Sequence, residues 1–267
     1  MSEDAGSARV SLQIERNGDE FAVHVATFVE HAAQLAIHRR GRFTVALSGG
    51  STPRDAYARL AESGRQNPID WKRSFVFFCD ERFVPYSDPD SNFGMVQRAI
   101  LEPASVPVDQ VFPISTSFAT AAESAQDYEA RLMKFFDTHD KSVPPRIDLV
   151  VLGVGEDGHT ASLFPGSAAV EVADRWAAAT PPGMLPPKVD RVTLTLPVIN
   201  AAREVLFLAA GPQKAQVVHD LIDGCTARSD LPAARVLPVD GHVTWIVDRD
   251  AARLLKTSGS AADAKNH

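Results

Sequence analysis

The chain has 267 residues, 45% of them hydrophobic, and a formal net charge of −7. This length and apolar content suffice for a sizeable core, in one large domain or at most two. The acidic balance argues against a nucleic-acid or anionic-membrane surface, although a few local basic groups can still hold a small anionic substrate. No segment approaches the run of about 18 apolar residues that a transmembrane helix needs.

Residues 1–8 are polar and acidic, without the basic and then apolar pattern of a signal peptide. The two cysteines, Cys79 and Cys225, are too few for a disulfide framework, and Cys79 lies in an apolar run typical of a reduced core thiol. We therefore expect a cytoplasmic protein that binds a small molecule and neither membrane nor nucleic acid. We also expect a monomer, with a weak dimer as the alternative.

The predicted elements alternate between strand and helix. Residues 10–15 alternate apolar and polar side chains like a short strand. Asn17 is expected to cap a helix that runs to about Arg40 and ends at Gly41. The later strands are predicted at 42–47, 74–79, 111–114, 147–152, 176–180, 191–196, 204–209 and 243–247, and the later helices at 53–63, 93–101, 119–138, 214–222 and 248–256.

This alternation predicts an α/β protein whose mostly parallel sheet is covered by helices on both faces. No internal repeat, low-complexity block or linker divides the sequence. We expect a single α/β domain over residues 1–267. Its core is expected at about 10–256, with disordered tails at 1–8 and 257–267.

Residues 48–53, Ser-Gly-Gly-Ser-Thr-Pro, join the strand 42–47 to the helix that follows. Thr52 suits the N-cap of that helix and Pro53 its first position. Backbone N–H groups at such a turn attract an anion, and the hydroxyl groups add donors. The pattern indicates a phosphate-binding loop, with an ordinary turn of small residues as the alternative.

Charged residues follow two other apolar strands. Asp80, Glu81 and Arg82 come directly after the strand 74–79. In open α/β sheets, ligands bind at the carboxyl ends of the strands, so we expect these side chains at the rim of the same cleft as the glycine-rich loop. A solvated loop is the alternative interpretation.

The strand 147–152 runs into the glycine-rich turn 153–158, which carries Glu156 and Asp157 and is followed by His159. A histidine beside carboxylates has its tautomer fixed and its imidazolium form stabilised. His159 is therefore the candidate for a catalytic base. The alternative is a packed histidine on a tight turn.

Two other interpretations of this region are weaker. The turn matches the dinucleotide pattern G-x-G-x-x-G, but Glu156 and Asp157 would stand where a pyrophosphate needs positive potential. A metal could use Asp80, Glu81 or His159 together with these acids, yet no ligand spacing such as H-E-x-x-H occurs. We expect no cofactor and no metal.

Five motifs occur along the chain in order, namely ALSGGSTP at 46–53, DER at 80–82 with DSN at 90–92, GVGEDGHTASLFP at 153–165, RVTLTLPVIN at 191–200 and GPQKA at 211–215. Together they closely resemble the glucosamine-6-phosphate isomerase/6-phosphogluconolactonase family, and in particular its lactonases. The likeness covers about residues 10–255. It implies a Rossmann-like three-layer α/β/α sandwich, similar to glucosamine-6-phosphate deaminase and ribose-5-phosphate isomerase.

The resemblance also implies an activity, the cofactor-free hydrolysis of 6-phospho-D-glucono-1,5-lactone to 6-phosphogluconate in the oxidative pentose phosphate pathway. In this chain it makes His159 the base that activates water, with Asp157 or Glu156 orienting it. Arg82 would face the lactone oxygens, with Asp80 nearby. The phosphate would be held by Gly49, Gly50, Ser51, Thr52, Arg191 and Lys214.

Two rival functions are open at this stage. A sugar-phosphate deaminase or isomerase on the same fold would need an acid near Phe164, within the run 160–165, and phenylalanine cannot transfer protons. A sugar-phosphate-sensing module without turnover would keep the phosphate loop but could dispense with His159. The acidic composition and the lack of an added helix-turn-helix at the N-terminus disfavour the module.

Overall fold

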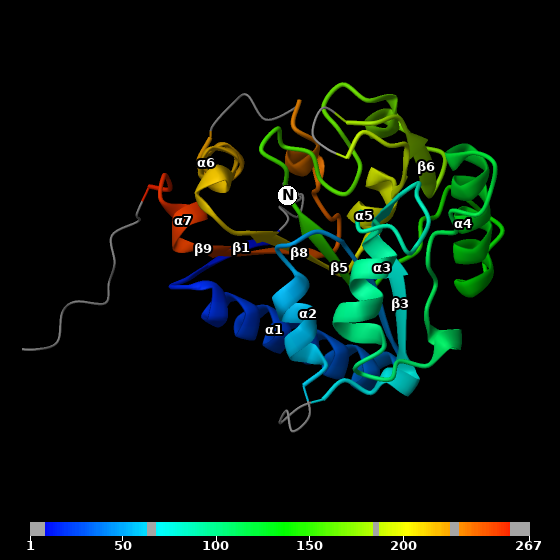
Figure 1. Ribbon diagram of the computed structural model, residues 1–267, viewed down its shortest axis with the longest axis horizontal. Helices are drawn as coiled ribbons and strands as arrows, with labels where there is room; N and C mark the ends of the chain where they lie inside the picture. The colour runs from blue at the N-terminus through cyan, green and yellow to red at the C-terminus, as the bar shows by residue number, and fades with distance from the viewer. Residues whose placement is uncertain (1–8, 63–67, 184–186, 225–229, 257–267) are drawn as a thin grey trace, which may run out of the picture.

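The computed structural model describes residues 9–62, 68–183, 187–224 and 230–256. Its centre is a six-stranded sheet in which every pair of neighbours is parallel (Figure 1). The strands lie in the order β1 (Arg9–Glu15), β9 (His242–Asp248), β8 (Glu204–Ala209), β5 (Leu149–Gly153), β2 (Phe43–Leu47) and β3 (Ser74–Phe78).

Helices cover both faces of this sheet, which confirms the predicted three-layer α/β/α architecture. On one face lie α1 (Gly18–Arg40), α2 (Arg54–Leu60) and α3 (Asn92–Val96), the last continuing as a π-helical segment, Gln97–Leu101. On the other face lie α5 (Leu196–Ala201) and α6 (Ala215–Ile222) (Figure 1). The remaining helices are α4 (Ala121–Phe135) and α7 (Arg249–Ala252).

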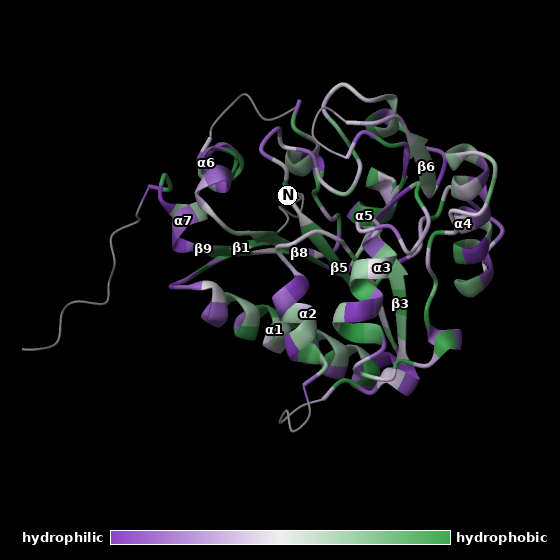
Figure 2. Cartoon of the chain, viewed as in Figure 1, coloured by the Kyte–Doolittle hydropathy of each residue, from purple (hydrophilic) through white to green (hydrophobic). Residues whose placement is uncertain are grey.

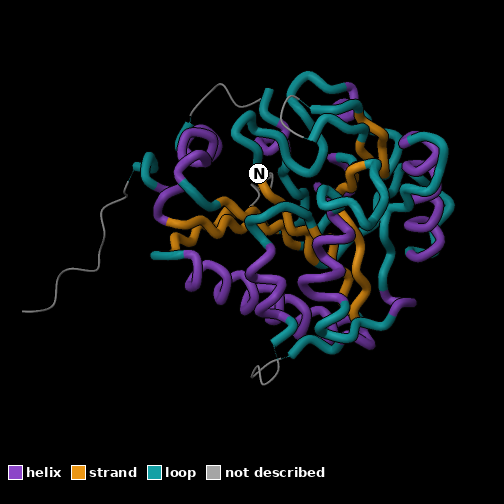
Figure 3. Tube along the Cα trace, viewed as in Figure 1, coloured by secondary structure: helices purple, strands orange, loops and turns teal. Residues whose placement is uncertain are grey.

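A second, three-stranded antiparallel sheet packs beside the first, and the sequence did not predict it as a separate sheet. It has the order β4 (Asp80–Arg82), β7 (Arg191–Leu194) and β6 (Ala177–Thr180). The charged run, expected to lie at the rim of the cleft after the strand 74–79, forms a short strand of its own. Three polar residues carry no apolar alternation that could have revealed it. Only Cys79 separates β3 from β4, and α5 links β7 to β8. The segment from β5 to β6 is mostly loop, which Figure 3 draws in teal.

Local sequence explains most of the elements. The central strands β2 and β5 are mostly apolar and buried on both faces, as expected for inner parallel strands. Figure 2 shows β5 in the green of hydrophobic residues. At the start of α1, the side chain of Asn17 accepts a hydrogen bond from the backbone N–H of Glu20. At its end, the N–H of Gly41 donates to the carbonyl of Ile37. Both predicted helix caps are confirmed.

Some element boundaries differ from prediction. Thr52 is not an N-cap, because α2 begins at Arg54 with Pro53 as its capping residue and no side-chain capping bond. The predicted strand 111–114 makes only an isolated bridge, between Val111 and Val76. The helix α5 was not predicted, because a proline and a short apolar run do not signal a helix.

The predictions made for the tails 1–8 and 257–267 and for Cys225 lie outside the residues that the structure describes. Cys79 is fully buried, as predicted for a core thiol. Within the described residues, no helix has the length and apolar character needed to cross a bilayer.

Tyr128 joins α4 to the end of β3 that leads into Asp80. Its buried hydroxyl accepts a hydrogen bond from the backbone N–H of Phe78 at 2.9 Å and donates one to the carbonyl of the same residue at 3.0 Å. One hydroxyl thus satisfies two backbone groups that lie beyond the regular strand ladder. The position of Asp80 depends on this contact because only Cys79 separates it from Phe78.

We predict that Tyr128→Phe lowers the free energy of unfolding by about 1–3 kcal/mol, because it leaves two buried backbone groups without a partner. Urea denaturation followed by circular dichroism measures this change. Tyr86→Phe is the matched control, since the half-buried Tyr86 hydroxyl donates to the single carbonyl of Ile114 and its loss should cost less. An unfolding midpoint for Tyr128→Phe equal to that of the unmodified chain would contradict the prediction.

Candidate active site

The carboxyl ends of four neighbouring strands, β8, β5, β2 and β3, lead into one cavity of about 370 Å³. The segments that follow these strands line it, together with Arg191 from β7. The cavity therefore brings together nearly all of the residues predicted for the site, namely Gly49, Gly50, Ser51, Thr52, Asp80, Arg82, His159, Arg191 and Lys214. Asp157 does not line the cavity and lies behind His159.

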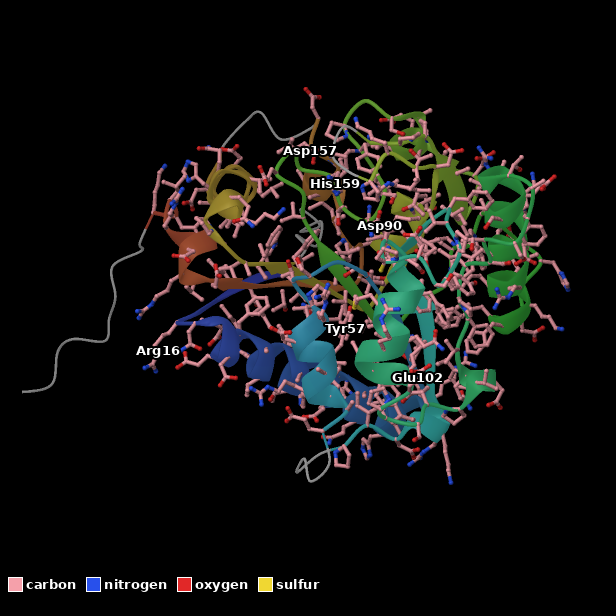
Figure 4. All side chains as sticks on the ribbon, viewed as in Figure 1. Arg16, Tyr57, Asp90, Glu102, Asp157 and His159 are labelled. Atoms are coloured by element: carbon pink, nitrogen blue, oxygen red, sulfur yellow. The ribbon has the colours of Figure 1, made fainter. Side chains whose placement is uncertain are left out.

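His159 and Asp157 form a directly hydrogen-bonded pair on the turn after β5 (Figure 4). His159 Nδ1 lies 2.5 Å from Asp157 Oδ1, and the backbone N–H of His159 donates to the same oxygen at 3.1 Å. Because a carboxylate can only accept, Nδ1 carries the proton and Nε2 is left with a free lone pair. Among the described residues, Nε2 has no partner. Glu156 is exposed and makes no contact with the ring, so Asp157 is the acid that holds His159.

The charge state of Asp157 suits this arrangement. Burial works to raise the pKa of its carboxyl group, but the hydrogen bonds from the side chain and the backbone of His159 hold the pKa below its ordinary value. Asp157 is therefore ionised at neutral pH. An ionised partner stabilises the imidazolium that forms when the ring takes up a proton.

Gly155 allows this pair to close. A Cβ atom at this position would lie 2.0 Å from His159 Nδ1 and 2.5 Å from Asp157 Oδ1. The N–H of Gly155 also donates to the carbonyl of His159 at 2.8 Å. The glycine pattern of this turn thus makes room for a histidine and its carboxylate. No helix begins within residues 159–167, whereas a dinucleotide site of this pattern places the pyrophosphate at a helix N-terminus.

Arg82 and Arg191 stand directly opposite each other on the paired strands β4 and β7. Like charges in that position destabilise a strand pair. Each guanidinium makes one hydrogen bond to a backbone carbonyl, and the Nε of each is buried without a partner among the described residues. Burial lowers the pKa of Arg191, the charge of Asp80 opposes this, and the charge of Arg82 lowers the pKa further. An anion between the two would relieve the repulsion.

Asp80 is buried, and each of its carboxylate oxygens accepts a hydrogen bond from a neighbouring side chain. Its Oδ1 accepts from Asn92 Nδ2 at 3.1 Å, and its Oδ2 accepts from Ser162 Oγ at 2.5 Å. These bonds make Asp80 a holder of other side chains rather than a free base. Asn92 Oδ1 and Ser48 Oγ line the cavity, are buried and have no partner among the described residues. Buried polar atoms are nearly always paired, so they indicate a polar ligand.

Glu81 differs from its charged neighbours. Its carboxylate accepts hydrogen bonds from the backbone N–H groups of Arg82, Asn92 and Phe93 and from the hydroxyl of Ser91. Burial raises the pKa of Glu81 to about 7, against the opposing effect of these donors. Glu81 thus anchors the start of α3 and does not line the cavity.

Phe164 is a site residue whose contacts the sequence did not reveal. Its ring centroid lies 4.8 Å from that of His159, and the guanidinium of Arg191 lies over the same ring at 5.2 Å. The ring is buried and separates the proposed base from a cation. The sequence showed only that Phe164 stands where a deaminase would have an acid. Its contacts with both His159 and Arg191 depend on the tertiary structure, so no local sequence pattern could have indicated them.

Lys214 reaches the cavity from a 3₁₀ turn, Pro212–Lys214, after β8. Burial lowers the pKa of its ammonium group, while the charges of Glu156 and Asp157 act in the opposite direction. Lys214 thus lies on the same side of the cavity as the histidine turn. No group of three or more His, Cys, Asp or Glu side chains that could hold a metal ion occurs within the described residues.

Comparison with known proteins adds two kinds of relative. The 6-phosphogluconolactonase of Rattus norvegicus is 39% identical over 91% of this chain and 93% of its own, and that of Homo sapiens is 36% identical over the same shares. The solved 6-phosphogluconolactonase from Trypanosoma cruzi has a TM-score of 0.82 and 29% identity, covering 95% of this chain and 100% of that one.

A monomeric glucosamine-6-phosphate deaminase has a TM-score of 0.76 at 18% identity, covering 91% of this chain and 99% of that one, which shows a shared fold alone. A family model described as glucosamine-6-phosphate isomerases/6-phosphogluconolactonase matches residues 16–245. These findings confirm the fold and the resemblance that the five motifs predicted. The chain belongs to the glucosamine-6-phosphate isomerase/6-phosphogluconolactonase family.

Proposed function

We propose that this chain hydrolyses 6-phospho-D-glucono-1,5-lactone to 6-phosphogluconate, with His159 as the base that activates water. The observation that carries the proposal is that His159, held by Asp157, lines one cavity together with two opposed arginines and a glycine-rich loop. The lactonase relatives at 36–39% identity support the activity. The role of each residue is argued from the geometry.

In the first step, His159 Nε2 takes a proton from a water molecule while the water oxygen attacks C1 of the lactone. The ring becomes an imidazolium, which the ionised carboxylate of Asp157 stabilises through Nδ1–H. General base catalysis of this kind contributes about 10²–10⁴-fold in rate. The proton acceptor is thus prepared before the substrate arrives.

The carbonyl oxygen of the lactone becomes negative as the tetrahedral intermediate forms. Arg82 supplies a half-buried cation at the cavity wall, and its buried Nε–H has no partner among the described residues, so it can donate to the developing charge. When the intermediate collapses, the bond from C1 to the ring oxygen breaks. The ring oxygen then takes the proton from the His159 imidazolium, which restores the base and releases a carboxylic acid that ionises in water.

The phosphate end of the substrate requires a separate anchor. We assign it to the loop Gly49–Thr52, with Arg191 and Lys214 supplying positive charge, because all of these line the same cavity as His159. Binding energy from the phosphate, which does not react, then orients C1 against the water. Asp80 acts by holding Asn92 at the cavity wall, and it also accepts a hydrogen bond from the buried Ser162.

A deaminase or isomerase would need an acid where Phe164 packs against His159. The buried ring can neither give nor take a proton, so the geometry favours the lactonase. A sensing module is disfavoured because a prepared base and two opposed arginines exceed what phosphate binding alone requires. We keep a cytoplasmic location and a monomeric state as predictions from the sequence.

We predict that His159→Ala abolishes enzymatic lactone hydrolysis, because it removes the unshared Nε2 lone pair that takes the water proton, whereas both oxygens of Asp80 already accept hydrogen bonds. The product, 6-phosphogluconate, should still bind, since the phosphate contacts remain. A pH-controlled assay with lactone generated in place measures the rate above spontaneous hydrolysis, and calorimetry measures product binding. Near-normal turnover in the variant would show that His159 is not the base.

We predict that Lys214→Ala and Arg191→Ala each raise KM by about 10–100-fold, because a charge-assisted hydrogen bond is worth about 1.5–3 kcal/mol. The same lactone assay, run over a range of substrate concentrations, gives KM for each. Lys134→Ala is the control, since Lys134 is exposed on α4 and does not line the cavity. An unchanged KM in both test variants would remove these cations from the phosphate site.

A direct product assay distinguishes the lactonase from its relatives on the same fold. We predict that the chain releases neither ammonia nor fructose 6-phosphate from glucosamine 6-phosphate, because Phe164 occupies the place of the acid. Coupled enzymatic detection of both products measures this. Production of either at a rate comparable with lactone hydrolysis would contradict the assignment.

A further inference from the structure

The turn that carries His159 is contacted on its outer side by a distant segment of the chain, residues 231–235. Gly158 has a backbone φ of +79°, a conformation that favours glycine, and a Cβ there would lie 2.7 Å from Leu231 Cδ2. The Leu231 side chain therefore packs directly on the Gly158 backbone. Neither Leu231 nor the 3₁₀ turn after it, Pro232–Arg235, lines the substrate cavity.

A hydrogen bond adds to this packing contact. The N–H of Ala233 donates to the carbonyl of Gly158 at 3.1 Å. Within the turn, the N–H of Gly158 donates to the carbonyl of Gly155 at 3.0 Å, and the N–H of Gly155 donates to the carbonyl of His159 at 2.8 Å. Because Gly155 also lies against His159 Nδ1, a shift of Gly158 is passed to the catalytic ring through this short chain of contacts.

The contacting segment is itself fixed to the body of the protein. Arg235 forms an ion pair with Glu171, on the 3₁₀ turn Ala168–Glu171, through both guanidinium Nη atoms. Its carbonyl accepts a hydrogen bond from the side chain of Asn200 in α5 at 3.0 Å. The residues that hold Leu231 in place are therefore separate from those that hold the substrate.

We propose that Leu231, together with the Ala233 N–H, positions His159 for catalysis by fixing Gly158 from outside the cavity. The proposal rests on the proposed lactonase function and adds a positioning residue to it. Leu231 does not touch the substrate and acts through the His159–Asp157 pair. A catalytic base must be held within hydrogen-bond reach of its water, and a misplacement of about 1 Å can cost about 10²-fold in rate.

The test compares Leu231→Ala with Leu231→Met and Leu231→Val in the lactone assay. Leu231→Ala is expected to lower kcat by about 10-fold or more with KM unchanged, because the phosphate anchor is elsewhere. Leu231→Val should lower kcat less, and Leu231→Met should keep kcat close to that of the unmodified chain because methionine conserves the volume of leucine. Leu237→Ala is the matched control, a truncation of an exposed leucine two residues beyond the same 3₁₀ turn.

A double-variant cycle separates positioning from general loosening of the fold. If Leu231 acts through the His159–Asp157 pair, Leu231→Ala should cost little further rate when Asp157→Asn has already broken that pair. If the double variant loses rate by the product of the two single-variant factors, the two residues act independently and the proposal is overturned. Wild-type kcat in Leu231→Ala, or a KM that rises as kcat falls, would also overturn it. If Leu231→Ala does not fold, Leu231→Val and Leu231→Met are compared instead. A lower kcat at unchanged KM in Leu231→Val but not in Leu231→Met supports the proposal, and wild-type kcat in both overturns it.

A second readout does not depend on activity. The short hydrogen bond between His159 Nδ1 and Asp157 is expected to give a far-downfield proton resonance in the NMR spectrum of the wild-type chain. Exchange broadening or loss of that resonance in Leu231→Ala, but not in Leu231→Met or Leu237→Ala, supports the proposal. An unchanged resonance in Leu231→Ala overturns it. An inactive wild-type chain would instead refute the proposed function, and the resonance would still test the positioning role.

Discussion

The candidate site depends on one interaction, the 2.5 Å hydrogen bond between His159 Nδ1 and Asp157 Oδ1. It fixes the tautomer of the ring, turns Nε2 toward the cavity and keeps a negative charge beside the forming imidazolium. Two residues apart in sequence, these side chains meet only because the turn folds back on itself. Gly155 leaves room for that closure, and the contact of Leu231 with Gly158 supports it from outside. The other residues of the site surround the cavity that the free Nε2 lone pair of His159 faces.

The cations of the site show how an acidic protein can bind an acidic substrate. The chain carries a net charge of −7, yet Arg82, Arg191 and Lys214 line one cavity. Burial lowers the pKa of Arg191 and of Lys214, so both cations are held in a place that disfavours their charge. Under the proposed function, the phosphate of the lactone would replace the lost hydration of these cations with direct contacts. The local arrangement of charges, not the net charge, therefore determines which substrate binds.

The sequence predicted the central sheet and most of the site because both follow from runs along the chain. Buried parallel strands are continuous apolar stretches, and the polar residues at their carboxyl ends converge at one edge. The strand Asp80–Arg82 was missed because its pairing depends on Arg191, far away in the chain. Phe164 and Leu231 act through tertiary contacts that no local pattern encodes. The choice between Asp157 and Glu156 also required the turn geometry, since both flank the same glycines.

That choice provides the most direct test of the account. The measurement is kcat for lactone hydrolysis by Asp157→Asn and by Glu156→Gln, each corrected for the spontaneous rate at the same pH. The structure predicts that Asp157→Asn loses about 10²–10⁴-fold in kcat with KM little changed, because the ring loses its tautomer control and its counter-charge. Glu156→Gln, which alters an exposed carboxylate without contact to the ring, should keep its rate. Full activity in Asp157→Asn, or an equal loss in both variants, would contradict the account.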